Sequence, residues 1–454
     1  MNQSTKIYDD VSVPKLVAKN AIPAMLSMLV ILIYNIADTF FVGQTGDPLQ
    51  VAAVSLATPV FLLFMATGNL FGIGGTSVIS RALGRGEHEY AKKVSSFCFY
   101  SGAIVGVIYI FLFSFFIENI LTLIGTSANT IEYTREYLLC VMFSAPFVII
   151  SNAFSNIVRS EGKAKEAMVG VMVGTVMNII LDPIMILGLK LGIFGAALAT
   201  VIGNIAGALY YVIYFMKKKS ILSISFKDFS MKEKIFTGVM AIGLPAAFNN
   251  ILMSVSNILL NNFLSSYGDN PVAAMGVATK VNMIVFFFLI GLGQGVQPLL
   301  GYFYGAKNME KFRSIIKFTA ICALVLGVSL TLVCWNFSGN IVKAFIDNQE
   351  VYSYGVSFVK AIMISGPFVG IMFLFINTLQ AIGAATASLV LSISRQGFVF
   401  IPLLFILNHF IGLNGIVYSQ PLADFIAIFL SGLLYYIEMK KFKKVISEKI
   451  PEKV

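Results

Sequence analysis

Charged residues are scarce in this chain of 454 residues, where Asp, Glu, Lys and Arg together make up 12%. Soluble globular domains carry about 25% of these residues. Hydrophobic residues reach 57% of the chain, and the mean hydropathy is +0.85. So little charge cannot cover a water-facing surface. The composition therefore excludes a soluble globular protein and predicts that the chain lies in lipid.

Histidine and cysteine are also rare, with two and four residues. The cysteines lie in apolar stretches without Cys-x-x-Cys spacing, and we interpret them as small buried hydrophobes. No grouping of Ser, His and Asp, of metal ligands or of paired acids is present, so we predict no catalytic residues, no metal site other than one for Na⁺, and no enzyme. The glycine-rich segments follow no predicted strand and lack the Lys-Ser/Thr of a phosphate loop. We therefore expect no cofactor.

Long apolar runs fill most of the chain. A helix needs roughly 20 apolar residues to cross a bilayer, and only helices satisfy their backbone within one such segment. Twelve runs meet this length: 16–43, 50–80, 94–117, 133–158, 166–188, 192–216, 235–266, 271–303, 314–337, 353–380, 386–408 and 412–437. The prediction is an all-α polytopic membrane protein with 12 transmembrane helices.

The two halves of the chain repeat each other. Pro146-Phe147-Val148 recurs 221 positions later as Pro367-Phe368-Val369, and Asn156 recurs at the same offset as Asn377. Six spans per half mean that both halves enter from the same side, so their symmetry axis follows the membrane normal. Two such bundles around a central site are typical of alternating-access transporters. We predict an N-lobe (1–216), a cytoplasmic linker (217–234), a C-lobe (235–437) and a basic cytoplasmic tail (438–454).

The basic residues predict the orientation. Most of the 32 Lys and Arg residues fall in the tail, the linker and the loops on one side of the predicted spans. Short cytoplasmic loops carry such an excess. Both termini are therefore predicted to be cytoplasmic in a multi-pass protein of the plasma membrane. The charges lie in short loops without a binding domain, so nucleic acid is not an expected partner.

Two acidic residues of the predicted spans are candidates for chemistry, because ionisable groups in lipid are costly and usually functional. Asp38 lies near one end of the first span and shares a helix face with Tyr34. Asp182 shares a face with Asn178 and precedes Pro183, which frees backbone carbonyls. These oxygen donors suit H⁺ or small alkali cations. The group around Asp182 is therefore predicted to bind a proton or a small cation.

Three further charges lie in the second half: Lys280 in span eight, Arg395 in span eleven and Asp424 in span twelve. A charge inside the membrane needs a partner, and either Lys280–Asp424 or Arg395–Asp424 provides one. A site for substrate or gating and a purely structural ion pair both fit this charge network. The sequence leaves both alternatives open.

In these features the chain resembles the multidrug and toxic compound extrusion (MATE) family, and within it the DinF-like branch. The resemblance rests on two six-span halves, the turn motifs at 81–86 and 301–306, and the motifs Asp38-Thr39 and Asn178-x-x-x-Asp182-Pro183. Thr200 follows Asp182 by 18 residues, as in that branch. The resemblance implies a cation site formed by Asp38, Asn178, Asp182 and Thr200. It also implies a cavity lined by Tyr34, Tyr137, Asn152 and Asn156.

The NorM-like branch of the same family has acidic residues in spans seven and ten, and this chain has none there. The resemblance implies a secondary active antiporter, most simply a monomer, that exports small amphipathic or cationic drugs by alternating access. With no nucleotide site, H⁺ or Na⁺ is the expected coupling ion. A lipid or lipid-linked oligosaccharide flippase of the same superfamily is the alternative. A membrane-embedded enzyme or a channel finds less support, because no filter-like loop is present.

Overall fold

The computed structural model describes residues 11–217, 220–232, 234–345 and 348–448. Lys6, Lys218, Lys219, Lys449 and Lys453, which contribute to the predicted orientation, lie outside these residues. The described part is helical, as predicted. Ten helices are long and apolar enough to cross a membrane, and two bent helix pairs bring the number to twelve if each pair is one span.

The first half holds α1 (Val13–Gly43), α2 (Pro48–Gly84), α3 (His88–Phe115), α4 (Ile117–Leu123), α5 (Ile131–Met142), α6 (Ala145–Ser160), α7 (Ala164–Pro183), the π-helix η2 (Ile184–Gly188) and α8 (Gly192–Met216). The second half holds α9 (Ile235–Ser265), α10 (Asp269–Gly305), α11 (Met309–Asn336), α12 (Ser338–Phe345), α13 (Gln349–Ile362), α14 (Gly366–Ile382), α15 (Ala385–Ile393), the π-helix η4 (Ser394–Val399), α16 (Phe400–Ile411) and α17 (Leu413–Glu448). We call these sets of helices the N-lobe and the C-lobe.

The internal repeat is visible in the shape of the helices. The fourth span bends by 55° between α5 and α6, and the tenth bends by 47° between α13 and α14. Each bend comes just before the repeated proline, Pro146 or Pro367, at the start of the second helix of the pair. Proline restricts the residue before it and lacks an amide hydrogen, so it suits the start of a helix after a break.

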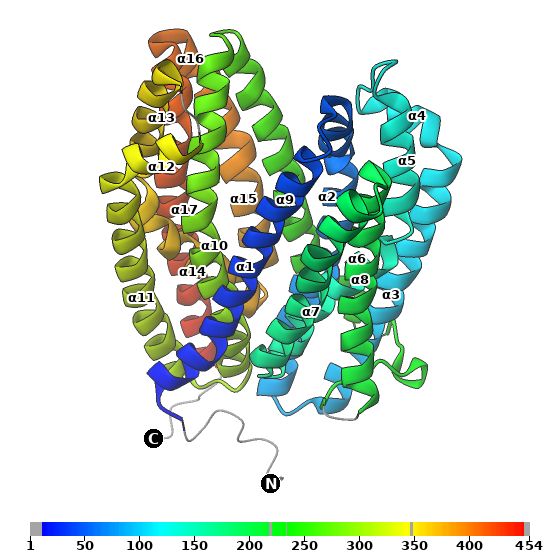
Figure 1. Cartoon of the computed structure of the whole chain (residues 1–454). Coiled ribbons are helices and arrows are strands. Elements are labelled where there is room, and N and C mark those ends of the chain that lie inside the picture. Colours follow the sequence, from blue (N-terminus) through cyan, green and yellow to red (C-terminus); the bar gives the residue numbers. More distant parts are fainter. Residues whose placement is uncertain (1–10, 218–219, 233, 346–347, 449–454) are drawn as a thin grey trace, which may run out of the picture.

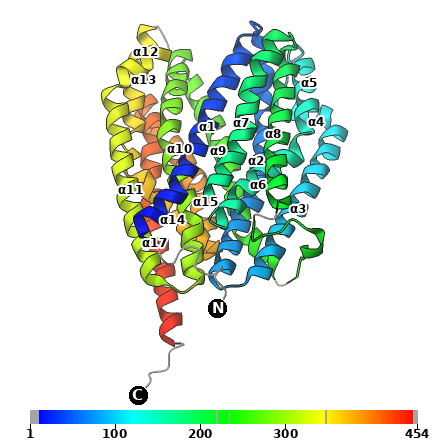
Figure 2. The same ribbon diagram turned by 60° about the horizontal axis from the view of Figure 1, so that its bottom comes forward.

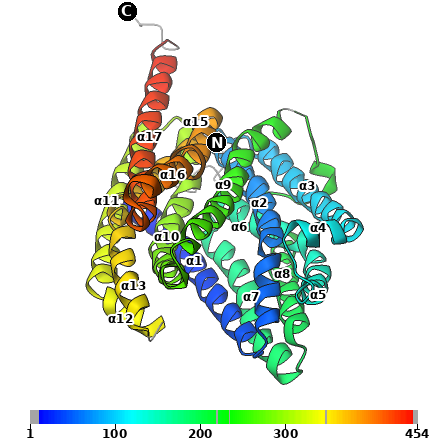
Figure 3. The ribbon, with the colours of Figure 1, turned by 90° about the horizontal axis from the view of Figure 1, so that it is seen from above.

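Two helices cross between the lobes. The packing places α1 against α10 and α11 as well as against α7, and places α9 against α2 as well as against α15. Figure 1 shows α1 running from the base of the C-lobe to the top of the N-lobe, and Figure 3 shows α1 and α9 between the two bundles. The lobes therefore exchange their first helices at the end that carries the chain termini.

At this end α2 and α10 touch through their backbones. A Cβ atom on Gly84 would lie 2.0 Å from the carbonyl oxygen of Tyr302, and one on Gly305 would lie 2.3 Å from that of Arg81. The two glycines are 221 positions apart, as the repeat requires. Glycine is needed here because no side chain fits between the helices. The lobes are thus closed against each other at the terminus-bearing end.

The segment between the lobes is fixed to the N-lobe. Its short helix η3 (Phe226–Asp228) lies beside α3, and Ser96 Oγ donates to the carbonyl of Ser225 at 2.8 Å. At the other end of the chain, α17 continues to Glu448 and projects beyond the other helices (Figure 2). The predicted tail therefore starts as an extension of this helix.

Candidate functional site

The site is centred on Asp182, at the end of α7. Its side chain is fully buried, and both carboxylate oxygens lack a hydrogen-bond partner among the described residues. One turn earlier, Asn178 Nδ2 donates to Thr200 Oγ1 of α8 at 3.3 Å, while Asn178 Oδ1 has no partner in the same part of the chain. Buried polar atoms are nearly always bonded, so these three oxygens, which have no partner among the described residues, are available to accept a proton or to coordinate a cation.

Helix α1 brings the second carboxylate to this place. Tyr34 and Asp38 lie one turn apart on α1, which packs against α7. The Tyr34 phenol interacts with the Thr200 hydroxyl and, electrostatically, with Asp38 and Asp182. Asp38 and Asp182 also interact with each other. The structure thus brings the two predicted acids together.

Tyr137 completes this group from α5. It is buried, and its phenol interacts electrostatically with both Asp38 and Asp182. Four helices, α1, α5, α7 and α8, therefore contribute oxygen atoms to one region inside the N-lobe. Such a set of carboxylate, amide and hydroxyl oxygens suits a proton or a hard cation such as Na⁺, and offers neither sulfur nor imidazole for softer metals.

Asn152 and Asn156 serve a different part of the N-lobe. Asn152 Nδ2 donates to the carbonyl of Met65 at 3.1 Å, which ties α6 to α2. Asn156 Nδ2 donates to the carbonyl of Asn152 at 3.1 Å, and its Oδ1 accepts from Arg159 at 3.2 Å. None of the hydrogen bonds between described residues joins these asparagines to the two acids.

In the C-lobe, Asp424 is paired with Arg395. Asp424 Oδ1 accepts from Arg395 Nε and lies 3.0 Å from Arg395 Nη2; both side chains are buried. Ser365 and Gln420 also donate to Asp424, at 2.9 and 3.0 Å. The guanidinium lies over the ring of Phe286, 5.1 Å from its centroid, and every oxygen of the carboxylate has a partner.

The alternative Lys280–Asp424 pair is wrong. Lys280 is exposed, and its ammonium lies 5.8 Å from the ring centroid of Phe345. Arg395 reaches Asp424 instead because the π-helix η4 carries it, and Ser256 of α9 donates to the backbone of Gln396 in the same turn. Local widening of a helix is common at functional sites.

One buried charge, Arg159, is not among the candidate residues predicted from the sequence. Arg159 lies in the last turn of α6 and is only 2% exposed. Nη1 donates to Asn156 and also, at 3.4 Å, to Gln294 Oε1 of α10. One signal in the sequence could have distinguished Arg159 from the loop residues. It lies three residues after Asn156, which belongs to the internal repeat, and directly follows the same apolar stretch.

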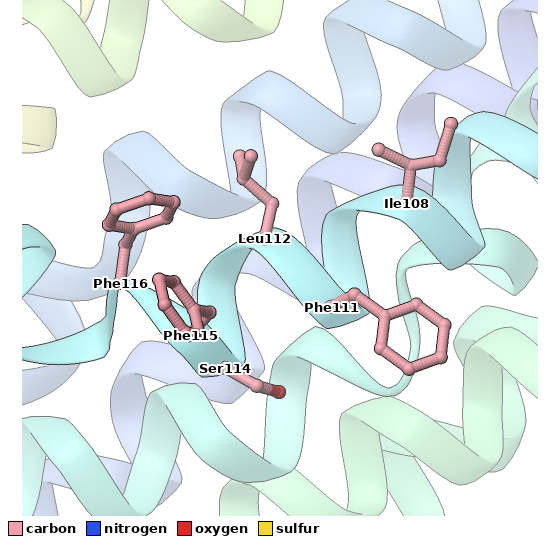
Figure 4. Close-up of a pocket in the computed structure, with 6 residues that line it drawn as sticks. All are labelled: Ile108, Phe111, Leu112, Ser114, Phe115 and Phe116. Carbon is pink, nitrogen blue, oxygen red and sulfur yellow. The ribbon is translucent and has the colours of Figure 1, made fainter.

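An apolar hollow also lies on α3 near its junction with α4 (Figure 4). Its lining is almost wholly apolar, and Phe111 and Phe115 are 71% and 82% exposed. No titratable group lines this hollow: it is formed by Ile108, Phe111, Leu112, Ser114, Phe115 and Phe116. We interpret it as part of the lipid-facing surface.

Comparisons with known proteins agree with this architecture. The family model described as MatE matches twice, at residues 23–184 and 245–406, once in each half of the repeat. The multidrug export protein MepA of Staphylococcus saprophyticus is 34% identical over 417 residues, covering 92% of both chains. MepA of Staphylococcus aureus MSSA476 is 33% identical with the same coverage.

Solved structures show the same fold. A crystal structure of MATE in complex with MaL6 superposes with a TM-score of 0.92, with 24% identity over 98% of this chain and 100% of the other. An outward-facing multidrug resistance MATE family transporter of the MOP superfamily gives a TM-score of 0.91, with 25% identity over 96% and 97%. These relatives are transporters rather than enzymes. The two matches of the family model and the 34% identity to MepA together show that this chain belongs to the MATE family of multi-pass membrane transporters.

Proposed function

We propose that this protein is a secondary active antiporter that exports small amphipathic, mainly cationic, compounds in exchange for inward H⁺ or Na⁺. One observation carries this proposal: Asp182 is buried, interacts with Asp38, and has no hydrogen-bond partner among the described residues for either carboxylate oxygen. An uncompensated carboxylate in a membrane protein is costly unless a cation visits it. The similarity to the MepA multidrug export proteins supports drugs as the exported class.

The coupling follows from competition between ligands. One H⁺ or Na⁺ bound between Asp182 and Asp38 lowers the net charge of the pair from −2 to −1 and so weakens the attraction for a cationic drug. Tyr34 and Asp38 lie on α1, which also contacts α10 of the other lobe. Neutralisation at the site therefore changes how α1 packs and favours the opposite arrangement of the lobes. Strict antiport requires a negative coupling free energy between the two ligands.

The proposal also includes the orientation of the protein in the membrane and its branch within the MATE family. The basic loops support cytoplasmic termini in the plasma membrane, and the motif formed by Asp38, Asn178, Asp182 and Thr200 supports the DinF-like branch. A flippase for pyrophosphate-linked lipids receives less support. Its cavity would need several free cationic groups, whereas Arg395 is tied to Asp424 and Lys280 is exposed, which leaves Arg159 as the one buried cation of the described residues without an acidic partner.

The test is efflux of a fluorescent cation from proteoliposomes with a pH gradient and a sodium gradient imposed separately. We expect one gradient to drive transport in the wild type and neither to drive it in Asp182→Asn. Asp269→Asn removes an exposed carboxylate at the start of α10 and is the control that should transport normally. Transport without either gradient, or driven equally in Asp182→Asn, would contradict the proposal.

A further inference from the structure

Arg159 is a buried cation that the coupling site does not use. A guanidinium stays charged at every physiological pH, and an uncompensated charge in a membrane protein needs an explanation. No carboxylate of the described residues lies within ion-pair distance of it. The nearby acid Glu161 is committed elsewhere: it accepts hydrogen bonds from Tyr214, Ser220 and the backbone of Ile221.

The acceptors that Arg159 does have are neutral amide oxygens at long distances, 3.2 Å to Asn156 and 3.4 Å to Gln294. Its Nε is buried without an acceptor in the described part of the chain. A guanidinium offers five N–H donors in a planar fork that matches a carboxylate. Like the Asp182 carboxylate, the Arg159 guanidinium is therefore buried with fewer hydrogen bonds than it can form, but it carries the opposite charge.

The repeat shows that packing does not require this charge. The position 221 residues after Arg159 is Gln380, and Asn377 stands in the place of Asn156. Gln380 is buried too, and its Oε1 accepts from Gln297 Nε2 at 3.5 Å. A neutral side chain thus fills the equivalent turn of the C-lobe. The charge of Arg159 serves another purpose.

The two acceptors of Arg159 belong to different lobes. Asn156 lies on α6 beside it, whereas Gln294 lies on α10 of the C-lobe. If the lobes separate at the terminus-bearing end, as the proposed transport cycle requires, Gln294 leaves with the C-lobe. Arg159 then loses an acceptor at the moment when the opening admits solutes from that side.

We propose that Arg159 binds the carboxylate of amphipathic substrates when the lobes separate at the terminus-bearing end. The inference rests on the proposed function and assigns to Arg159 the selection of carboxylate-bearing substrates. The substrate oxygens replace Gln294 and complete the planar fork of the guanidinium. Charge-assisted bonds of this kind are about twice as strong as neutral ones.

This anion subsite is separate from the coupling site. Asp182 lies 18 residues beyond Ala164 along α7, and Ala164 follows Arg159 after a short turn. At 1.5 Å per residue the two layers are about 27 Å apart, more than the length of a small drug. Arg159 therefore contacts the substrate during loading, and its removal should raise KM more than it lowers the maximal rate.

The experiment uses two dyes that differ at one group: rhodamine B has a free carboxylate, and rhodamine B ethyl ester has an ethyl ester there. Transport is measured in proteoliposomes for the wild type, Arg159→Gln and Arg159→Lys. We expect Arg159→Gln to raise KM for rhodamine B roughly tenfold, the loss of one charged hydrogen bond, and to leave the KM for the ethyl ester within about twofold. Arg159→Lys keeps the charge and should recover part of the difference.

The control variant is Gln380→Ala, which disturbs the equivalent turn of the C-lobe and should affect both dyes alike. An equal loss for both dyes in Arg159→Gln would show a structural role, and no change for either would show no role; each result overturns the proposal. Fluorescence anisotropy of dye binding to purified protein gives an independent reading. Dye-selective binding that depends on Arg159, without transport of either dye, would contradict the proposed function and leave the anion subsite standing.

Discussion

In the N-lobe, Asp182 is buried with both carboxylate oxygens free, whereas in the C-lobe the equally buried Asp424 accepts hydrogen bonds from Arg395, Ser365 and Gln420. The repeat relates the two surroundings. Gln420 corresponds to Thr200 at an offset of 220, and Ser365 corresponds to Ser144 at 221. The C-lobe cluster thus occupies the region that corresponds to the cation site of the N-lobe.

This difference shows how equivalent regions of two related lobes can have different roles. In the C-lobe a cation is permanently attached to the chain as the guanidinium of Arg395. In the proposed mechanism the corresponding cation of the N-lobe comes from solution. A tethered cation cannot be exchanged, so we propose that the C-lobe pair is structural and that ion coupling belongs to the N-lobe.

The largest effect is expected from Asp182→Asn. Asparagine keeps the size of the side chain and one oxygen but carries no charge, so it cannot exchange a cation. We expect dye efflux to fall to background while the protein still folds and inserts. Efflux is measured at matched expression against Asp269→Asn. Normal efflux by Asp182→Asn would remove the asymmetry between the lobes.

Asp424→Asn should act on stability instead. It leaves the buried Arg395 without a counter-charge, and breaking a buried ion pair costs about 3–5 kcal/mol. We expect a lower melting temperature of the purified protein, and recovery in the double variant Asp424→Leu with Arg395→Met. If the single variant keeps its melting temperature but loses its response to ions, Asp424 belongs to the coupling site and the comparison fails.

A third prediction concerns the contact between α2 and α10, to which each lobe contributes one glycine. Gly84→Ala and Gly305→Ala each place a Cβ atom within 2.3 Å of a backbone oxygen of the other lobe. Overpacking of this kind costs about 1–3 kcal/mol. Both variants should lower the melting temperature by a similar amount, because the contact is symmetric. Gly276→Ala is the control: nothing lies within 4 Å of its Cβ position on α10. Unequal losses would show that the closed end is not symmetric.

The sequence predicted the spans, the repeat and the N-lobe group because each depends on short-range rules. Asn178 and Asp182 share a helix face wherever α7 lies, and a carboxylate in a span is conspicuous by its cost. The repeated prolines, Pro146 and Pro367, indicated the repeat, but the bends that precede them were not predicted and come from the structure. That Asp38 approaches Asp182 followed only from the family resemblance, because it depends on how α1 packs against α7.

The predictions from sequence failed where the environment of a side chain depends on tertiary packing. Arg159 was not singled out because it precedes a polar turn, yet its helix brings it to the junction with α10, where it donates to Gln294. Lys280 and Arg395 were equal candidates in sequence, since both lie in predicted spans. The choice between them depends on the register of η4, and no local pattern marks a π-helix.

The smallest effect is expected from Lys280→Met, which completes the comparison. Lys280 lies on the exposed side of α10, and its recorded contact is the ring of Phe345, 5.8 Å from the ammonium. An exposed contact between a cation and a ring contributes about 0.5–1 kcal/mol, so the melting temperature should change little. Combined with Asp424→Asn, Lys280→Met should restore nothing, because the stranded cation is Arg395. If this combination instead recovered stability while Arg395→Met did not, Lys280 would be the counter-charge of Asp424 in the working protein. The buried Arg395 would then not be the fixed partner of Asp424, and the distinction between the two lobes would have to be abandoned.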